Sequence, residues 1–210
     1  ETLVDAFANS CNSAFSYIGA HIDKESFRSL CNSFLFNKSI PVSFEYNKSS
    51  FVLSEASSVS EAQETAIGQG KTMMSPLHNL MIAATVANGG KLMTPYVVDY
   101  IEDAYGRVVK QNKPSVIAEL MSAKEADYLT ECMEEVIDSG TGGSMRWSAY
   151  NAAGKTGSAQ YDSSDNIHSW FTGFAPADNP KLCISVVLEG GYSGSSAQYV
   201  AKAVFDAYFD

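Results

Sequence analysis

Polar and apolar residues along the first third of the chain recur at the spacing of amphipathic helices. The pattern predicts helices over residues 3–8, 13–22 and 24–32. Residues 49–63 are polar and rich in serine, which predicts a loop. The N-terminal third is therefore expected to be helical, with one long irregular connection.

Two longer helices are predicted from their capping signals. Ser75 followed by Pro76 is a typical helix start, and Asn88-Gly-Gly90 is a typical stop. Ser122-Ala-Lys-Glu125 is a capping box, so a helix is expected through residue 137 and is closed by Gly140. The residues at core spacing are Leu77, Leu80, Met81 and Ala84 in the first helix, and Leu129, Met133 and Val136 in the second.

Strand patterns dominate the rest of the chain. Residues 96–101 and 107–110 flank a turn-forming Asp103-Ala-Tyr-Gly106 segment, which predicts a β-hairpin. Further on, strand-forming stretches separated by turn residues predict a three-stranded antiparallel meander. Its strands are expected over residues 152–161, 167–175 and 182–188.

The last segment, residues 194–210, is predicted to be a helix. Val200, Val204 and Tyr208 recur every four residues in it and are expected to cover the sheet. Helices followed by a meander and a closing helix indicate a mixed α/β fold of the α+β type, with an antiparallel sheet flanked by helices.

The composition of the chain is that of one globular domain and argues against nucleic-acid binding and against a membrane-spanning segment. The chain has 210 residues, of which 45% are hydrophobic and 18% charged, so we expect residues 1–210 to form a single domain with a substantial core. A net charge of −10 and a pI near 4.7, without any basic run, argue against nucleic acid as a partner. No apolar stretch is long enough to span a bilayer, so no membrane contact is expected of this portion.

Cysteine and histidine usage gives no sign of a metal or of a catalytic triad. Cys11, Cys31, Cys132 and Cys183 are widely spread and lack metal-ligand spacing, so they are expected to be buried small side chains. The three histidines have no spacing that suggests a triad. A structural metal is therefore not expected.

Two short segments carry the candidate chemistry. Lys155-Thr156-Gly157 lies on the first strand of the meander and puts a cation and hydroxyls on a strand edge, where they can hold a carboxylate and an acyl oxygen. Ser10-Cys-Asn12 lies at a junction between two predicted helices. Taken singly, Ser10 is a helix cap and Lys155 a solvated lysine; only their joint occurrence with other segments favours catalysis.

These segments, with four others in order along the chain, give it a resemblance to the transpeptidase domain of the penicillin-binding proteins. The Ser10-Cys-Asn12 context is most similar to the high-molecular-mass, monofunctional (class B) members. The remaining segments are Ile67-Gly-Gln-Gly70 leading to Ser75-Pro76, Ala87-Asn-Gly-Gly90, Gly140-Thr-Gly142 and Trp170-Phe-Thr-Gly-Phe-Ala-Pro176.

The resemblance implies a role for each candidate residue. Ser10 would relay a proton with Lys155 as its partner, and Asn12 would orient the amide on the acyl side of the substrate. Thr156 and Ser158 would bind the terminal carboxylate of a D-alanyl-D-alanine stem peptide or of a β-lactam. The Ser158 N–H would be half of an oxyanion hole. Gly157 would leave space for substrate along the strand.

One departure from the family pattern affects activity. The family's acylated serine lies in a Ser-x-x-Lys motif, and no serine in this sequence has a lysine three residues later. We therefore expect the chain to be an internal, C-terminal portion of a longer protein and inactive alone. The nucleophile helix, two of the family's five strands and a membrane anchor would precede Glu1, leaving one sheet edge and an apolar face exposed.

The resemblance implies a peptidoglycan D,D-transpeptidase that acts by serine acyl transfer without a metal or an organic cofactor. It would act at the extracytoplasmic face of a bacterial cell membrane, together with other cell-wall synthesis proteins. Two alternatives stay open at this point. One is a D,D-carboxypeptidase or β-lactamase of the same superfamily, which the Ser10-Cys-Asn12 context disfavours. The other is a non-catalytic module, either a β-lactam sensor or a scaffold that has lost its nucleophile. Sensors usually carry valine where Asn12 stands.

Overall fold

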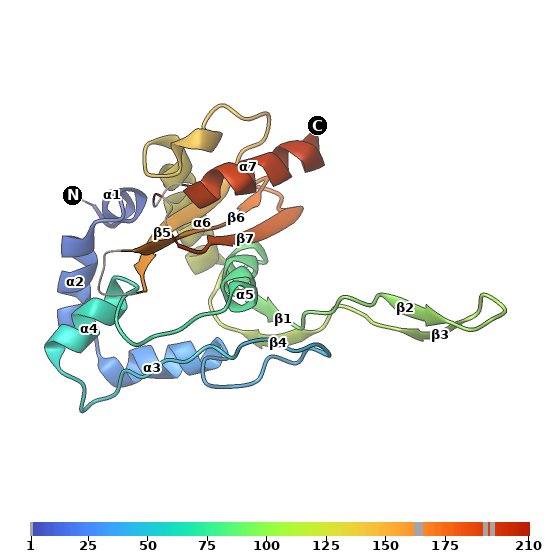
Figure 1. The fold of residues 1–210 in the computed structure, drawn as a ribbon, viewed down its shortest axis with the longest axis horizontal. Helices are drawn as coiled ribbons and strands as arrows, with labels where there is room; N and C mark the ends of the chain where they lie inside the picture. Colours follow the sequence, from blue (N-terminus) through green and yellow to red (C-terminus); the bar gives the residue numbers. More distant parts are fainter. Residues whose placement is uncertain (1, 162–165, 191–192, 194–195) are drawn as a thin grey trace.

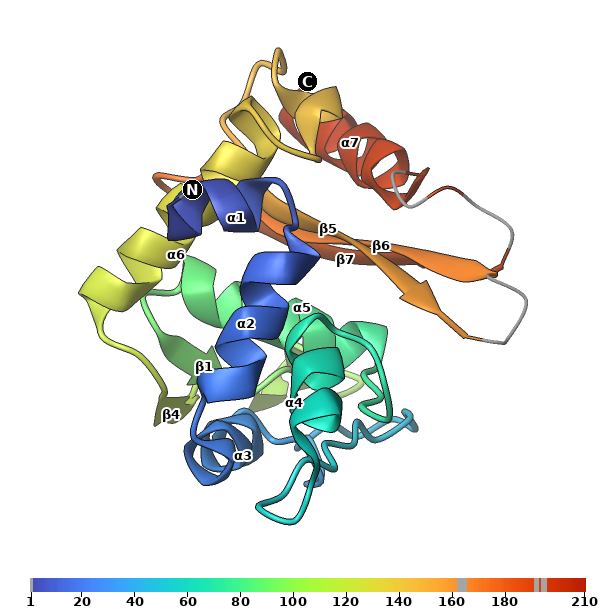
Figure 2. The ribbon, with the colours of Figure 1, turned by 90° about the vertical axis from the view of Figure 1, so that its left-hand side faces the viewer.

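The structure is a computed structural model that describes residues 2–161, 166–190, 193 and 196–210. A three-stranded antiparallel sheet, β5-β6-β7, lies between helices on both faces (Figures 1 and 2). The helices are α1 Leu3–Ala8, α2 Asn12–His21, α3 Lys24–Ser33, α4 Val59–Ala66, α5 Pro76–Ala87, α6 Ala123–Asp138 and α7 Ser196–Phe209, with a 3-10 turn η1 at Gly143–Met145. The strands are β1 Lys91–Met93, β2 Tyr100–Glu102, β3 Val108–Gln111, β4 Val116–Glu119, β5 Ala153–Gln160, β6 Ile167–Ala175 and β7 Leu182–Leu188.

The two faces of the sheet have separate cores. On one face, α7 packs against the sheet through a cluster that includes Phe171 and Phe205, both fully buried. On the other face, α5 and α6 contribute Val86 and Met133 to a cluster around Phe174. The sheet therefore has a hydrophobic layer on each side, and the predicted α+β fold with a helix-flanked antiparallel sheet is confirmed.

Helices α1, α2 and α4 lie beside the sheet, at the left of Figure 1, and α3 lies below them. α2 packs against α4, and Gly19 is the point of closest approach. A Cβ built on Gly19 would stand 2.6 Å from the Cβ of Ala66 and 2.7 Å from the Ala62 carbonyl oxygen. Only glycine allows the two backbones to meet at this distance.

The prediction that residues 49–63 form a loop is wrong in its last part, because α4 begins inside it at Val59. Ser58 and Glu61 form a reciprocal capping box at its start: each side chain bonds to the backbone N–H of the other residue. Ala62 is buried in a cluster with Phe51 and Leu53. Tertiary packing and capping thus outweigh the polar, serine-rich composition.

The prediction that Val200, Val204 and Tyr208 cover the sheet is also wrong. These three residues are exposed, and the sheet-facing residues of α7 are Ala197, Ala201 and Phe205. Both stripes repeat every four residues, so the period alone could not distinguish them. The alanines let the helix lie close to the sheet. Residue 194, the predicted start, lies outside the described residues.

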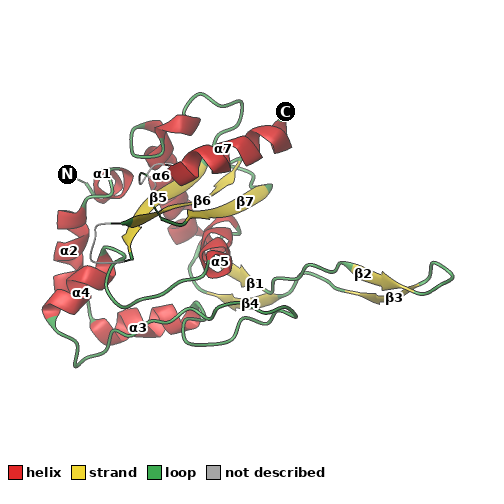
Figure 3. Cartoon of the chain, in the orientation of Figure 1, coloured by secondary structure: helices red, strands yellow, loops and turns green. Residues whose placement is uncertain are grey.

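The short strands were predicted only in part. The hairpin is confirmed as β2 and β3, although its first strand begins four residues later than expected. This hairpin projects away from the body (Figures 1 and 3). β1 and β4 form a second two-stranded sheet that the sequence pattern did not indicate. Within the described residues, β7 pairs only with β6, so its other edge is open.

Candidate active site

Lys155 is positioned by the pairing of β5 with β6. The register sets Lys155 opposite Thr172 and Gly154 opposite Gly173. A Cβ on Gly154 would stand 2.4 Å from Cζ of Phe171, so glycine is required for the strand to lie over this buried ring. Gly154, the residue before Lys155, therefore allows β5 to pack directly against the core.

Ser10 is held by the end of α1. The Cys11 N–H bonds to the Ala6 carbonyl at 2.8 Å, and the Ser10 N–H bonds to the Phe7 carbonyl at 3.2 Å. This pair of bonds is a Schellman motif, which needs a left-handed residue at the position of Ser10. Ser10 has φ = 53°, a conformation that glycine usually supplies. The backbone is therefore strained at this serine, as is common at functional positions.

The structure brings Ser10 and Lys155 together although 145 positions separate them in the sequence. Lys155 Nζ donates to Ser10 Oγ at 2.9 Å and to the Thr156 carbonyl oxygen, also at 2.9 Å. The ammonium also lies 5.7 Å from the centre of the Phe7 ring. Burial lowers the pKa of Lys155 to about 8, because a partly desolvated site disfavours the charged amine.

The other predicted site residues lie on β5 and at the start of α2. Thr156 is buried, and its hydroxyl lies 2.5 Å from the hydroxyl of Thr141. Ser158 is exposed, and a Cβ on Gly157 would stand 3.3 Å from Cβ of Trp170. Asn12 is the exposed first residue of α2. No side-chain hydrogen bond joins it to Ser10 or Lys155 within the described residues.

The outer edge of β5 presents hydrogen-bond donors. The Ser158 carbonyl accepts a bond from Gln69 Nε2 at 3.2 Å, and the Thr156 carbonyl accepts from Lys155. In an antiparallel ladder the N–H and C=O of one residue point the same way, so the Ser158 N–H also points away from β6. With both carbonyls occupied, this edge suits a ligand that carries hydrogen-bond acceptors.

The sequence did not indicate that Gln69 and Thr141 contact β5. Both belong to segments that had been recognised, Ile67-Gly-Gln-Gly70 and Gly140-Thr-Gly142, but neither segment had been given a role. Their positions against β5 depend on tertiary packing, which sequence spacing does not reveal.

The histidines lie apart from this cluster. His168 stacks on Tyr161 with ring centres 4.1 Å apart, and its Nδ1 accepts a bond from the Gly190 N–H at 3.1 Å. His78 is buried and contacts a backbone carbonyl, and His21 bonds to its own helix. None of the three contacts Ser10 or Lys155 in the part of the chain that the structure describes.

Two absences concern only the described residues. No group of three histidine, cysteine, aspartate or glutamate side chains is arranged to hold a metal ion there. Among the same residues, no helix has the length and apolar character required to span a bilayer. All four cysteines are free thiols.

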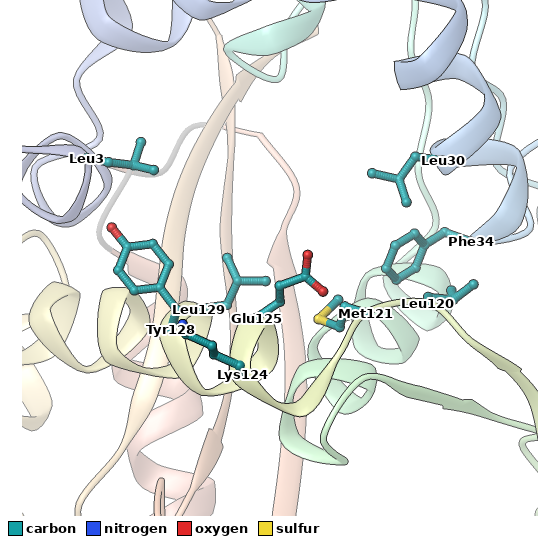
Figure 4. Close-up of a pocket in the computed structure, with 9 residues that line it drawn as sticks. All are labelled: Leu3, Leu30, Phe34, Leu120, Met121, Lys124, Glu125, Tyr128 and Leu129. Carbon is teal, nitrogen blue, oxygen red and sulfur yellow. The ribbon is translucent and has the colours of Figure 1, made fainter.

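A pocket of about 570 Å³ lies away from the Lys155 cluster, between α1, α3 and the start of α6 (Figure 4). None of the predicted site residues lines it. Its walls are mostly apolar and lack a convergent set of polar groups, so we place the candidate chemistry at β5. The lining residues are Leu3, Leu30, Phe34, Leu120, Met121, Lys124, Glu125, Tyr128 and Leu129.

Known proteins match this chain in sequence. The family model described as "Penicillin binding protein transpeptidase domain" matches residues 1–210. Stage V sporulation protein D of Bacillus subtilis is 29% identical over 198 residues, which are 90% of this chain and 30% of that protein. Peptidoglycan D,D-transpeptidase MrdA of Acinetobacter baumannii is 35% identical over 160 residues, 70% of this chain and 24% of MrdA.

Solved structures share the fold. The D,D-transpeptidase domain of a peptidoglycan glycosyltransferase from Eggerthella lenta matches with a TM-score of 0.90 and 27% identity, over 99% of this chain and 54% of that one. The imipenem acyl-enzyme complex of penicillin-binding protein A from Mycobacterium tuberculosis matches with a TM-score of 0.89 and 29% identity, over all of this chain and 47% of that one. The chain thus spans about half of these solved chains and less than a third of the two curated relatives.

Proposed function

This chain belongs to the penicillin-binding protein transpeptidase family, and on that premise we propose that it is part of a peptidoglycan D,D-transpeptidase. The observation that supports the proposal most directly is the contact between Lys155 Nζ and Ser10 Oγ at 2.9 Å. It joins the loop serine and the strand lysine that the reaction requires. In this proposal residues 1–210 form a single unit that contributes one part of the transpeptidase domain.

The reaction is acyl transfer through a serine ester. In the first half, the serine oxygen attacks the carbonyl between the two D-alanines, the C–N bond breaks, and the leaving amine takes up a proton. In the second half, an acceptor amine attacks the ester, the new C–N bond forms, and the serine regains its proton. Each half therefore needs one proton carried between nitrogen and oxygen.

Ser10 and Lys155 carry that proton in the proposed mechanism. Because the ammonium of Lys155 donates to Ser10 Oγ, the Ser10 hydroxyl can give its own proton to the leaving amine and be replenished by Lys155, which in turn takes up the proton that the attacking serine releases. The same two groups return the proton in the second half. Asn12, exposed two residues after Ser10, orients the amide of the acyl donor.

The edge of β5 binds the terminal carboxylate. Lys155 supplies positive charge, and the hydroxyls of Thr156 and Ser158 supply hydrogen bonds to the carboxylate oxygens. The Ser158 N–H points from the same edge and supports the developing oxyanion. Gly157 between them has no side chain to block a ligand lying along the strand.

The acylated serine, in this proposal, lies outside residues 1–210. No serine in the sequence is followed by a lysine three residues later, and the matched region covers only 30% of stage V sporulation protein D and 24% of MrdA. We propose the extracytoplasmic face of the bacterial membrane as the site of action, with stem peptides and β-lactams as ligands and other cell-wall synthesis proteins as partners. The D,D-transpeptidase names of the relatives do not favour a carboxypeptidase, β-lactamase, sensor or scaffold.

Labelling with a fluorescent penicillin tests the proposed function. The protein produced with the sequence that its gene encodes upstream of Glu1 is expected to become covalently labelled. Residues 1–210 alone are expected to give no stable penicilloyl adduct by intact mass spectrometry. Peptide mapping would locate the modified serine. A folded longer protein that takes no label would contradict the transpeptidase proposal, and an adduct on residues 1–210 would contradict the location of the nucleophile.

The pKa of Lys155 makes a prediction about pH. Because its pKa is lowered to about 8, Lys155 loses its proton and charge as the pH rises above 8, whereas an exposed lysine keeps them up to about pH 10.4. The acylation rate with a carboxylate-bearing penicillin is therefore expected to be level below pH 8 and to fall about tenfold per pH unit above it. Stopped-flow acylation between pH 6 and 10 measures this. A rate that rises through pH 8 would instead mean that the neutral amine acts as a base.

A further inference from the structure

The segment Gly140-Thr141-Gly142 connects α6 to η1 and has no role in the mechanism described above. It lies between the end of α1, strand β5 and helix α7. We propose that Thr141 is a positioning residue, which directs the hydroxyl of Thr156 at the ligand carboxylate and ties the Ser10 loop to β5. This proposal rests on the proposed function, because it concerns the same carboxylate site.

Thr141 makes three polar contacts, each with a different part of the site. Its N–H donates to the Ala8 carbonyl oxygen at 3.2 Å, two residues before Ser10. Its hydroxyl lies 2.5 Å from the hydroxyl of Thr156. Its carbonyl oxygen accepts from Gln198 Nε2 on α7 at 3.3 Å. One residue therefore joins the loop of the proton-relay serine, the carboxylate-binding strand and the helix behind the sheet.

The glycines on either side explain how the segment reaches this position. A Cβ on Gly140 would stand 2.2 Å from the Ala8 carbonyl oxygen, and a Cβ on Gly142 would stand 2.7 Å from Cδ1 of Ile137. Neither space can hold a side chain. The two glycines let the backbone come close enough for Thr141 to contact both Ala8 and Thr156.

Gln198 holds the segment from the other side. It is a polar residue of α7 that is only 4% exposed, and an unpaired amide would be costly there. Both ends of its amide are used. Nε2 donates to Thr141, and Oε1 accepts from the Ser144 hydroxyl at 2.7 Å and from the Ser144 N–H at 3.3 Å. Residues 141–144 are thus held to α7 by hydrogen bonds to both ends of the Gln198 amide.

The direction of the bond between the two hydroxyls follows from the ligand. Each hydroxyl has one proton to donate, and a carboxylate can only accept. For Thr156 to donate to the carboxylate, Thr141 must donate to Thr156 Oγ1. A hydroxyl that already accepts a hydrogen bond is a stronger donor and has a defined orientation. Thr141 therefore prepares Thr156 for an anionic ligand without touching that ligand.

The test compares two ligands that differ only in the carboxylate: a penicillin and its methyl ester, whose carboxyl group is neutral. The protein is the gene product that includes the sequence upstream of Glu1. Thr141→Val removes the hydroxyl and keeps the shape of the side chain. It is expected to slow acylation by the acid about tenfold and acylation by the ester less than about twofold. Thr141→Ser keeps the hydroxyl and is expected to leave the acid-to-ester ratio within about twofold of its original value.

A double-mutant cycle shows whether Thr141 acts through Thr156. In a Thr156→Val background, Thr141→Val is expected to have no further effect on acylation by the acid, because its partner hydroxyl is already gone. Equal losses for acid and ester would overturn the proposal, as would additive losses in the cycle. Circular dichroism checks that Thr141→Val is folded. If it is not folded, Thr141→Ala is used in the same comparison of acid and ester, because it only removes atoms.

The outcomes separate this inference from the proposed function. If the unaltered protein is not acylated by the penicillin, the proposed function fails. If the unaltered protein is acylated and the acid-to-ester ratio is the same in Thr141→Val, only the positioning role of Thr141 fails.

Discussion

Replacing Lys155 by alanine is expected to lower the acylation rate with penicillin by on the order of 10²-fold or more. The substitution removes the donor to Ser10 Oγ, 2.9 Å away, and with it the proposed route for the proton. It also removes the only charge assigned to the carboxylate subsite. Stopped-flow or gel-based labelling of the protein produced with its upstream sequence measures the rate.

Two control variants separate these effects from damage to the fold. Lys155→Met keeps the length of the side chain without the charge and is expected to lose as much activity as the alanine variant. Lys181→Ala removes an exposed lysine just before β7 and is expected to acylate at the normal rate. A Lys155→Ala protein that acylates within about threefold of the unaltered protein would remove Lys155 from the mechanism, since on the order of 10² is expected.

The contact between Ser10 and Lys155 could be anticipated from the sequence because two independent signals converge. A helix junction carries Ser10, a strand edge carries Lys155, and the family resemblance brings the two elements together. What the sequence could not indicate is the geometry behind the contact. Ser10 takes a left-handed conformation that its residue type does not favour, and only the two bonds at the end of α1 reveal it.

Two helix starts were predicted correctly from the side chains that cap them. Ser75 and Ser122 cap α5 and α6 as expected, because a cap is a local interaction between residues three positions apart. Ser58 follows the same rule with Glu61, but its serine-rich surroundings suggested a loop. The capping box was the better signal, since it satisfies backbone donors directly, while composition is only a correlation.

Contacts between distant segments could not be predicted in the same way. Gln69 and Thr141 lie in loops 89 and 15 residues from their partners on β5. Neither residue type is unusual in a loop, so only the folded chain shows what it bonds to. Strands β1 and β4 pair across a similar gap, and with three or four residues each they are too short to give a period-two pattern.

Substituting Phe205 by alanine is expected to cost about 3–5 kcal/mol of unfolding free energy. Phe205 is fully buried between α7 and the sheet, in a cluster with Phe171 and Ala201, and its ring centre lies 5.6 Å from that of Tyr150. The small side chains at the neighbouring sheet-facing positions cannot fill the cavity that alanine leaves. Urea unfolding of the 210-residue chain, followed by tryptophan fluorescence, measures the change.

Tyr208→Ala is the matched control, because it removes an aromatic ring from the same helix at a position that is 57% exposed. Its expected cost is below about 1 kcal/mol, as is usual for surface substitutions. Comparing Phe205→Ala with Tyr208→Ala shows which side of α7 is packed against the sheet, a question that the four-residue period in the sequence cannot answer. Equal losses would mean that both stripes are packed and that the helix is turned from the orientation in which Ala197, Ala201 and Phe205 meet the sheet. A large loss at Phe205 alone would agree with the structure, in which α7 packs its Phe205 side against the sheet that includes β5, the strand of Lys155 and Thr156.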